Sequence, residues 1–360
     1  MWGHLTSSLR RLTVRSGEPH TAPDKPLVVV FGATGAQGSS VVAALLASGR
    51  YRIRAVTRHA DSPRAAHLRD AKVEVAQADQ ADRHAVRAAL EGAYGAFVVT
   101  DYYSLGEREE EVGRGVVEEA KGAGVQHVVW STLPHVHRLS KGQLNVPHFT
   151  NKAKVEEVVR ASGFKHHTFV MCAFYYQNFA HFHLTREEGD GTVVFELPMA
   201  PDDMLTAFDV DDTGAAVLNA LDHPDDWDGE YMCLAGYHAP VHQYVSDFHR
   251  VAARPARLHT TDKAASEEWT QMFRWFSQHT YFGCHDISNA RRCNPHLKTW
   301  RQWLQESGWK GPEGGEGKGE AKGEAKGEAE CKSGVRGVGG GAKEVEQEGE
   351  GPPKAHVAGA

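Results

Sequence analysis

The stretch LVVVFGATGAQG, residues 27–38, joins an apolar run directly to a GxxGxxG pattern. After a strand, the first glycine of such a pattern permits a tight turn, the second lets backbone amides approach a pyrophosphate, and the third lets the next helix pack closely. The N-terminus of that helix then faces the anion. Gly32, Gly35 and Gly38 therefore predict a dinucleotide site, provided that further strand–helix units follow.

Further units of this kind do follow along the chain. Apolar, β-branched runs alternate with helical patterns, and five of these runs are expected to be strands: residues 51–57, 73–77, 97–100, 125–130 and 168–171. A helical pattern over residues 36–48 is closed by Gly49, and another after Pro147 is closed by Gly163, as is typical of helix ends. The alternation predicts an α/β protein with a doubly wound parallel sheet, the NAD(P)-binding Rossmann fold.

The end of the second expected strand, Thr57-Arg58-His59, indicates which dinucleotide binds. An acidic residue at this position would bind the adenosine ribose of NAD(H) and repel a 2′-phosphate. The first carboxylate after the strand is Asp61, whereas Arg58 can donate charge-assisted hydrogen bonds to that phosphate. The sequence therefore predicts NADP(H); an ordinary surface arginine is the alternative interpretation of Arg58.

Composition divides the chain into four parts. Residues 24–172 carry the Rossmann pattern. In residues 173–309 the alternation weakens and Trp, Phe, Pro and His become frequent, which predicts a smaller α+β C-terminal lobe with some elements returning to the Rossmann sheet. Residues 310–360, rich in Gly, Glu and Lys, are expected to be a disordered low-complexity tail. Residues 1–23 have helically spaced apolar residues and no acid before Glu18, so they are either a transit peptide or a disordered arm.

Charge and composition argue against several classes of function. The net charge of −7 gives no electrostatic reason to expect nucleic-acid binding. No stretch is long and apolar enough to predict a membrane span. Five scattered cysteines favour a reducing compartment over a disulfide framework. The expected location is the cytoplasm or the nucleus, and mitochondrial or plastid targeting by residues 1–23 is the alternative.

A metal site is not expected. Cys284, His285, Cys293 and His296 lie close together in the sequence, but their spacing matches no zinc pattern. Structural zinc is usually bound by two short ligand pairs, and adjacent Cys and His residues do not easily reach one ion together.

Four short motifs lie in order along the chain: GATGAQG at 32–38, VTR at 56–58, ADQAD at 78–82 and HFTNK at 148–152. Together they resemble the NmrA-like family of the atypical short-chain dehydrogenase/reductase superfamily, from about residue 26 to residue 309. The resemblance implies an NADP-loaded Rossmann domain with a small C-terminal lobe. It also implies contacts with each part of the cofactor. The pyrophosphate would be bound by Gly32, Ala33, Thr34, Gly35, Ala36 and Gln37, with Gly38 completing the turn, and the 2′-phosphate by Arg58. The adenine would be contacted by Asp79 and Gln80, the ribose by Thr100, Asp101 and Tyr102, the nicotinamide ribose by Lys152, and the nicotinamide end by Tyr175, Tyr176, Gln177 and Asn178.

Some of these positions have a structural interpretation as well. Asp79, with Asp82 three residues later, forms an N-terminal cap arrangement, which is compatible with adenine binding. Asp211 and Asp212 precede Thr213 and Gly214 and are expected to cap a helix.

The set of residues that usually carries out a reduction is incomplete in this sequence. Short-chain reductases usually protonate their substrate with a Tyr four residues before a Lys, assisted by a Ser after the preceding strand. Ser131 and Lys152 are present here, but His148 stands where the Tyr is expected. Imidazole can transfer protons near neutral pH, but it cannot form the phenolate of the usual mechanism. These three residues are the catalytic candidates if the chain is an enzyme.

An intact cofactor motif beside an altered proton-donor position favours a sensor. The expected function is an NADP(H)-binding redox-sensor protein whose cofactor occupancy controls association with regulatory protein partners, with a homodimer as a further option. The alternative is an NADPH-dependent oxidoreductase that acts on a quinone or a small carbonyl compound. Two positions depart from the family: Gln177 is often Glu there, and a basic residue is replaced near Gly113. The family's contacts therefore carry over less directly at the nicotinamide end than at the pyrophosphate.

Overall fold

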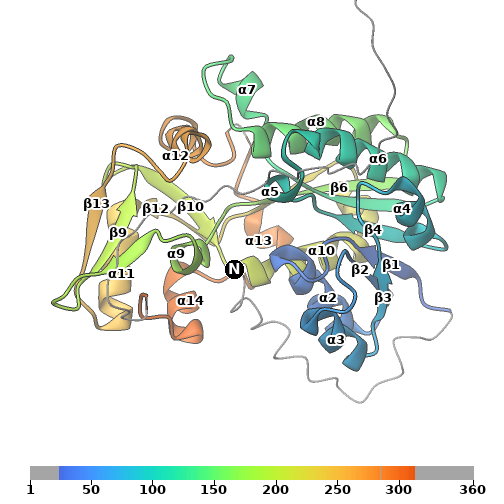
Figure 1. Cartoon of the computed structure of the whole chain (residues 1–360), viewed down its shortest axis with the longest axis horizontal. Helices are drawn as coiled ribbons and strands as arrows, with labels where there is room; N and C mark the ends of the chain where they lie inside the picture. Colours follow the sequence, from blue (N-terminus) through green and yellow to red (C-terminus); the bar gives the residue numbers. More distant parts are fainter. Residues whose placement is uncertain (1–23, 284, 313–360) are drawn as a thin grey trace, which may run out of the picture. The chain divides into compact units, whose positions relative to one another are not determined.

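The largest sheet of the structure is parallel and lies in the right half of Figure 1. The computed structural model describes residues 24–283 and 285–312. Within them, seven parallel strands pair in the order β11-β6-β5-β4-β1-β2-β3. These strands are β1 (Leu27–Val30), β2 (Arg52–Thr57), β3 (Glu74–Gln77), β4 (Gly95–Val98), β5 (His127–Thr132), β6 (His166–Cys172) and β11 (Tyr231–Leu234). The predicted doubly wound α/β fold is confirmed, and each of the six expected strands overlaps a strand of this sheet.

Helices cover both faces of the sheet, and each face has its own apolar core (Figure 1). Helices on one face include α2 (Ala36–Ser48), α3 (Pro63–Asp70) and α10 (Thr213–Asp222), and those on the other include α4 (Arg83–Leu90), α6 (Glu109–Gly122) and α8 (Pro147–Ala161). All four residues of β1 are buried, because a parallel strand covered on both faces needs apolar side chains throughout. The helix predicted over residues 36–48 ends at Gly49, whose φ of 64° is the left-handed conformation that glycine tolerates.

A smaller lobe follows β6. It contains two three-stranded sheets, in the orders β12-β10-β7 and β13-β9-β8. The strands are β7 (Phe174–Tyr175), β8 (Thr185–Glu187), β9 (Val193–Leu197), β10 (Met204–Phe208), β12 (Tyr237–Pro240) and β13 (Ala256–Thr260). The helices of this part are α9 (Asn178–His181), α11 (Val241–Ala252), α12 (Glu267–His279), α13 (Ala290–Cys293) and α14 (Trp300–Ser307). The remaining short elements of the described chain are α5 (Tyr102–Leu105), α7 (Val136–Leu139) and the 3-10 turns Gly106–Arg108, Val210–Asp212 and Pro224–Trp227.

Aromatic side chains form the core of this lobe, which explains their frequency after residue 172. Tyr176, Phe179 and Trp300 are fully buried. The ring of Trp300 lies 5.2 Å from those of Tyr176, Phe179 and Trp303, centroid to centroid, and is stacked on the last of these. Burial of such large rings stabilises α14 against the lobe.

The chain returns to the Rossmann sheet in the middle of the lobe sequence. β11 pairs with β6 along Tyr231–Leu234, and α10 packs on α2. The two helices approach closely because a Cβ on Gly214 would lie 2.1 Å from the carbonyl oxygen of Ser40. The Ser40 hydroxyl accepts a hydrogen bond from the Gly214 amide at 2.8 Å and donates one to the Asp211 carbonyl at 2.6 Å. Residues 213–234 therefore belong to the Rossmann half, although the residues before and after them form the lobe.

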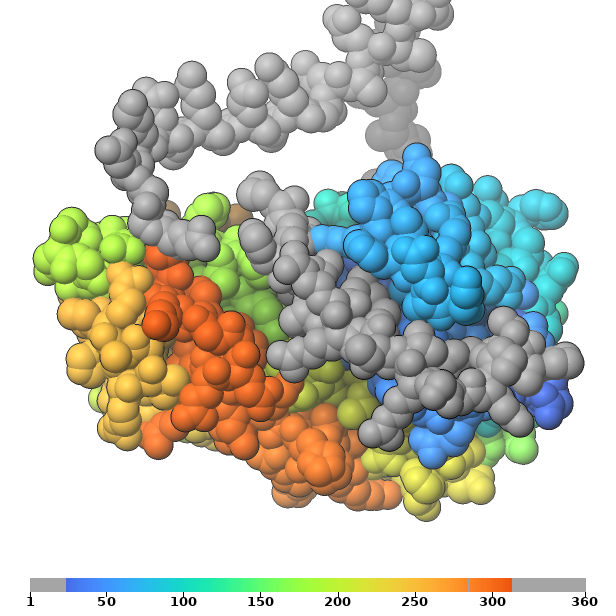
Figure 2. Space-filling model, turned by 90° about the horizontal axis from the view of Figure 1, so that it is seen from below, coloured from blue at the N-terminus to red at the C-terminus, as the bar shows by residue number. Residues whose placement is uncertain are grey.

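The C-terminal part of the described chain crosses the face shown in Figure 2, where its residues are orange. It packs through α14 on α11 and through α13 on α10. The C-terminal segment therefore contacts elements of both the lobe and the Rossmann sheet.

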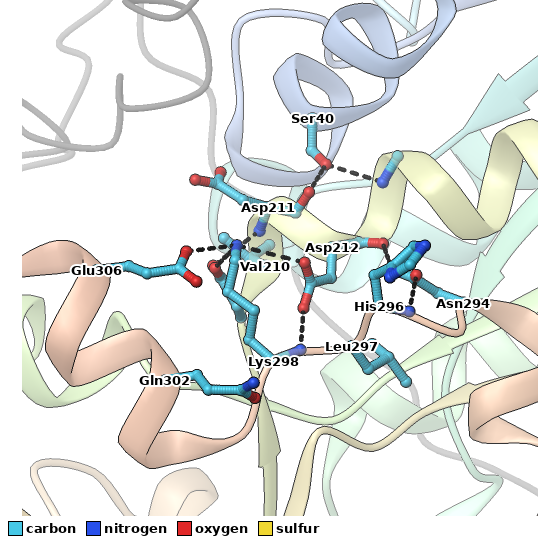
Figure 3. Close-up of polar contacts among 12 residues, drawn as sticks. Ser40, Val210, Asp211, Asp212, Asn294, His296, Leu297, Lys298, Gln302 and Glu306 are labelled. Carbon is cyan, nitrogen blue, oxygen red and sulfur yellow. Dashed lines mark hydrogen bonds and ion pairs between the residues drawn. The ribbon is translucent and has the colours of Figure 1, made fainter.

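Asp212 does not cap α10, contrary to the sequence expectation. It stands at the N-cap position, but its carboxylate makes no cap hydrogen bond. Its Oδ2 instead accepts from the backbone amide of Lys298 at 2.8 Å, and the Lys298 ammonium lies 3.4 Å from Oδ1 (Figure 3). Asp209 caps the preceding 3-10 turn, because its side chain accepts from the amide of Asp211. The long-range ion pair holds the C-terminal segment and replaces the local cap.

Among residues 24–283 and 285–312, no helix combines the length and the apolar character needed to cross a bilayer. In the same residues no three His, Cys, Asp or Glu side chains come together in a way that could hold a metal ion. Of the cysteines and histidines weighed as zinc ligands, Cys284 lies outside the described residues.

A buried histidine in β5 makes the stability of the fold sensitive to acid. The hydroxyl of Thr168 donates to the Trp227 carbonyl at 3.0 Å, so it accepts from Nε2 of His127, also at 3.0 Å. Nδ1 of His127 is buried without a partner among the described residues. Burial, followed by the neighbouring His166, lowers the pKa of His127 to about 3.

We expect His127 to make unfolding more favourable as the pH falls. In the unfolded state the pKa of this histidine is about 6.5, so below that pH the unfolded state takes up a proton. The folded state binds the same proton only near pH 3. This group therefore lowers the free energy of unfolding by up to about 1.4 kcal/mol per pH unit in that window. Urea unfolding between pH 7.5 and 5.5 should show a smaller pH dependence in His127→Gln. The exposed control His84→Gln should keep the wild-type slope, and an unchanged slope in His127→Gln would contradict the assignment.

Candidate functional site

The glycine turn between β1 and α2 has the geometry that the sequence predicts for binding a phosphate. Gly32 has a φ of 62°, and the amide of Gly35 donates to its carbonyl at 2.8 Å. A Cβ on Gly38 would lie 2.1 Å from the Gly32 oxygen, so no other residue fits there without moving the helix. α2 begins after Gly35 without a side-chain cap. The turn therefore leaves the helix N-terminus uncapped by any side chain, as a pyrophosphate site requires.

Two arginines stand next to this turn. Arg58, directly after β2, is exposed and donates to Oγ of Ser104 at 3.2 Å. Arg64, in the first turn of α3, donates to the carbonyl of Thr34 at 3.1 Å. Sequence reasoning identified Arg58 but missed Arg64, because nothing local shows that α3 folds back over the glycine turn. The guanidinium group of Arg58 is exposed at the end of β2, where it can stabilise a phosphate.

Asp79 and Gln80, the expected adenine contacts, lie in the turn after β3. Nε2 of Gln80 donates to the carbonyl of Val99 at 3.0 Å, which ties this turn to the end of β4. Oδ1 of Asp79 accepts from the amide of Ala81 at 2.9 Å. The cap of α4 comes from Asp82, which accepts from two amides of the first helical turn. Asp79 thus shapes the approach to the helix, and its contact with adenine stays a prediction.

A hydrogen-bonded chain connects three of the predicted residues. Oγ of Ser131 donates to Oε1 of Gln37 at 2.8 Å, and Nε2 of Gln37 donates to the hydroxyl of Tyr175 at 2.7 Å. Burial raises the pKa of Tyr175, so this residue is a phenol at neutral pH. This series of hydrogen bonds joins the end of β5, the first turn of α2 and β7. It connects Ser131 through Gln37 to Tyr175, whose contact with the nicotinamide end stays a prediction.

Lys152 is paired with a carboxylate that the sequence did not reveal. Its Nζ donates to Oε1 of Glu109, and the side chains of both residues are almost fully buried. The hydroxyl of Thr100 donates to the same oxygen at 2.8 Å. Glu109 begins α6 within an acidic run, and that pattern is typical of an exposed helix start. The sequence therefore offered no signal that one of these carboxylates is buried.

His148 is paired with Glu268, the second residue of α12. Glu268 accepts from Nδ1 of His148 and from its backbone amide, the latter at 3.3 Å. Burial lowers the pKa of His148, while the bond to Glu268 acts in the opposite direction. The imidazole is therefore neutral at pH 7, with its proton on Nδ1 and its lone pair on Nε2. Next to it, Nε1 of Trp269 donates to the hydroxyl of Tyr103 at 2.8 Å, so α12 contacts the Rossmann half at two places.

Tyr102 and Asp101 complete the group beside His148. The ring of Tyr102 lies 6.0 Å from the imidazole, centroid to centroid. Oδ1 of Asp101 accepts from the amide of Tyr103 at 3.2 Å, and its Oδ2 accepts from Ser104. Through Ser104, Asp101 is connected to Arg58. The structure thus brings the expected ribose contacts and the expected 2′-phosphate contact to one edge of the sheet.

The sequence matches the NmrA-like family over residues 24–305, most of the chain. The chain belongs to the NmrA-like family. The predicted resemblance is therefore confirmed.

Several relatives in the family are named as oxidoreductases. The NmrA-like family domain-containing oxidoreductase himF of Aspergillus japonicus is 34% identical over 158 residues, 42% of this chain and 48% of himF. The oxidoreductase hkm9 of Aspergillus hancockii is 28% identical over 252 residues, 64% of this chain and 74% of hkm9. The matched part thus spans about half the length of the first relative and about three quarters of the second.

Solved structures share the fold. NmrA, a negative transcriptional regulator crystallised with NADP, has a TM-score of 0.69 and 24% identity, covering 78% of this chain and 95% of that one. The same protein has also been crystallised with NAD. The NADPH-dependent quinone oxidoreductase QOR2 of Escherichia coli, complexed with NADPH, has a TM-score of 0.62 and 18% identity, covering 78% and 99%. At these identities the likeness shows the Rossmann-type fold alone.

In this NmrA-like chain, two of the four residues expected along the nicotinamide end are engaged in the interior. Tyr176 is fully buried and donates to the carbonyl of Lys298 at 3.1 Å. Nε2 of Gln177 donates to Asp209 at 2.5 Å, and its Oε1 accepts from the amide of Val210 at 3.3 Å. Asp209 also accepts from the Lys298 ammonium, which explains why a neutral amide suits this position. The contacts of Tyr176 and Gln177 with a cofactor stay predictions.

The other two of these residues differ in position. Asn178 begins α9 and is half-buried, whereas Tyr175 is in the hydrogen-bonded chain described above.

The second departure from the family, at Gly113, has a steric cause. A Cβ there would lie 2.9 Å from Val155 and 3.2 Å from Trp130, so α6 and α8 leave no room for a basic side chain.

Proposed function

We propose that this NmrA-like chain binds NADP(H) at the glycine turn and acts as a redox sensor whose cofactor occupancy controls association with a protein partner. The observation that carries the proposal is the bond between His148 and Glu268. It joins the expected nicotinamide end of the site to α12 of the C-terminal lobe, a surface element distant in sequence. The partner is a regulatory protein, and a second copy of the chain is a further option.

The residues present suit NADP(H). The steric requirement at Gly38 and the uncapped start of α2 fit a pyrophosphate, and Arg58 fits a 2′-phosphate. The NADP in the structure of the related NmrA supports the assignment. When bound, the cofactor supplies a hydride donor or acceptor. Sensing then requires only that the chain bind it differently in two conformations.

Internal partners at the proton-transfer positions favour sensing over reduction. Lys152 is neutralised by Glu109, and His148 donates its one imidazole proton to Glu268. A neutral imidazole whose proton is engaged in this way has none to give a substrate from Nε2. The contacts of Glu268 and Trp269 instead transmit any movement at His148 or Tyr103 to α12. Action in the cytoplasm or nucleus is part of this proposal.

The same pair also favours a second candidate, an NADPH-dependent reductase of a quinone or small carbonyl compound. A carboxylate that accepts from Nδ1 stabilises an imidazolium, so His148 could take up a proton and pass it from Nε2. The relatives named as oxidoreductases support this candidate. Ser131 and Lys152 would then position the substrate and cofactor.

A binding measurement combined with hydrogen exchange tests the sensor. NADPH should change amide exchange in α12 of the wild type, and Glu268→Gln should abolish that change while NADPH affinity stays within about threefold, because the altered bond contributes little to binding. The control Glu267→Gln removes the same charge from the neighbouring residue, whose side chain accepts from Gln271 one helical turn away, and should behave as the wild type. Unaltered exchange in the wild type would contradict the sensor.

NADPH oxidation across quinones and aldehydes tests the reductase. If His148 transfers a proton, His148→Ala should lower turnover by roughly 100-fold while NADPH affinity barely changes. Lys152→Ala should weaken NADPH binding under either hypothesis. Strong wild-type turnover that collapses in His148→Ala would overturn the sensor proposal in favour of the enzyme.

A further inference from the structure

Glu109 is a fully buried carboxylate with one oxygen in use and one without a partner. Oε1 accepts from Lys152 and from Thr100. Oε2 is buried and has no hydrogen-bond partner among the described residues. Glu109 itself has no exposed surface, and the side chain of Lys152 is only 9% exposed. The sequence motifs assigned no function to Glu109.

A buried carboxylate oxygen without a donor is costly, because folding removes its water and returns nothing. Such an atom therefore points to a donor that arrives with a ligand. The two residues that bond to the other oxygen are both expected at a ribose of the cofactor: Thr100 beside the ribose and Lys152 near the nicotinamide ribose. A ribose hydroxyl is the donor that this position would receive.

The charge of Glu109 has a second consequence. The nicotinamide ring is positively charged in NADP⁺ and neutral in NADPH, so any fixed charge nearby changes the ratio of the two affinities. Lys152 alone would disfavour the oxidised ring, and Glu109 alone would favour it. Because the two groups form a buried ion pair, their effects on the ring largely cancel.

We infer that Glu109 is a cofactor-binding residue: its Oε2 accepts a ribose hydroxyl, and its charge offsets that of Lys152, which sets the preference between NADP⁺ and NADPH. This inference rests on the proposed binding of NADP(H) at the glycine turn. It adds the residue pair that keeps the affinities for the two redox forms comparable. Without the cancellation, the ratio of the two affinities would shift about tenfold toward one redox form.

The test compares the dissociation constants of NADP⁺ and NADPH by calorimetry. Glu109→Gln keeps the size of the side chain and an acceptor for Thr100, but leaves Lys152 uncompensated. We expect the ratio of the NADP⁺ constant to the NADPH constant to rise about tenfold, with both forms bound more weakly. Lys152→Met should lower the same ratio about tenfold. The double variant should return the ratio to near the wild-type value.

Glu111→Gln is the matched control, because it removes one negative charge from the same turn of α6 at a side chain that is 78% exposed. Its ratio should equal that of the wild type. If Glu109→Gln does not fold, Lys152→Met and the double variant decide, since replacing both members of a buried pair by neutral groups is tolerated better than removing one. A ratio that stays constant through the series would overturn the role of Glu109 while leaving the proposed function intact. A wild type that binds neither form would overturn both.

Discussion

Gly38→Ala should weaken NADPH binding about 100-fold, because a methyl group at this position would lie 2.1 Å from the carbonyl oxygen of Gly32. That oxygen belongs to the backbone of the turn and cannot move aside alone. The start of α2 would have to shift, and the amides that face the pyrophosphate would shift with it. Overpacking of this kind also lowers the free energy of unfolding by about 1–3 kcal/mol. Calorimetric titration and urea unfolding measure the two effects.

Gly115→Ala is the control for this variant. Gly115 is in the interior of α6, where an added Cβ would make ordinary contact with Arg83 at 3.8 Å. Alanine favours a helix interior over glycine by about 0.5–1 kcal/mol, so this control should be at least as stable as the wild type and bind NADPH equally well. Full NADPH affinity in Gly38→Ala would show that the cofactor does not use the start of α2.

Arg58→Ala should weaken NADPH binding by roughly 10- to 150-fold and leave NADH binding nearly unchanged. The 2′-phosphate would lose a charge-assisted, bidentate partner, and such bonds contribute roughly 1.5–3 kcal/mol. In the structure the guanidinium is exposed and makes one hydrogen bond, to Ser104, so its loss should affect stability little. Titration of both nucleotides against both proteins measures the discrimination.

Arg69→Ala serves as the control for Arg58. Arg69 is in the last turn of α3 and donates to the carbonyl of Ala60. This variant removes the same charge and should retain the NADPH preference. An equal loss of NADPH and NADH affinity in Arg58→Ala would mean that Arg58 does not recognise the phosphate, and would direct attention to Arg64.

The Rossmann half could be predicted from the sequence because its signals are local. Glycine spacing, apolar runs and helix-ending glycines all act within a few residues, so β1, the turn and α2 were predicted together. β11 was not predicted as a strand of the sheet. It has four residues, and its partner β6 ends 59 positions earlier at Cys172, so only the folded chain brings them together.

The site was predictable only where a motif names the residue. Arg58 and Lys152 belong to short motifs, whereas Glu109 and Glu268 are acids at helix starts, where charge complements the helix dipole on any surface. Their burial against Lys152 and His148 depends on packing between elements far apart in the sequence. The failed prediction for Asp212 has the same cause, because a local cap competes with an ion pair to Lys298 that no local pattern reveals.

Because α10 and β11 return to the central sheet, the sequence of the lobe is interrupted by a segment of the Rossmann half. The lobe is therefore not a separate domain that follows the Rossmann half. The polypeptide leaves the sheet after β6, comes back for residues 213–234 and leaves again. A fragment ending at residue 172 would lose α10 from the face of α2 and expose β6 as an unpaired, apolar edge, the kind of edge on which strands of other molecules assemble. The cofactor-binding half is therefore not an autonomous folding unit when it is cut at residue 172, and we expect that fragment to aggregate.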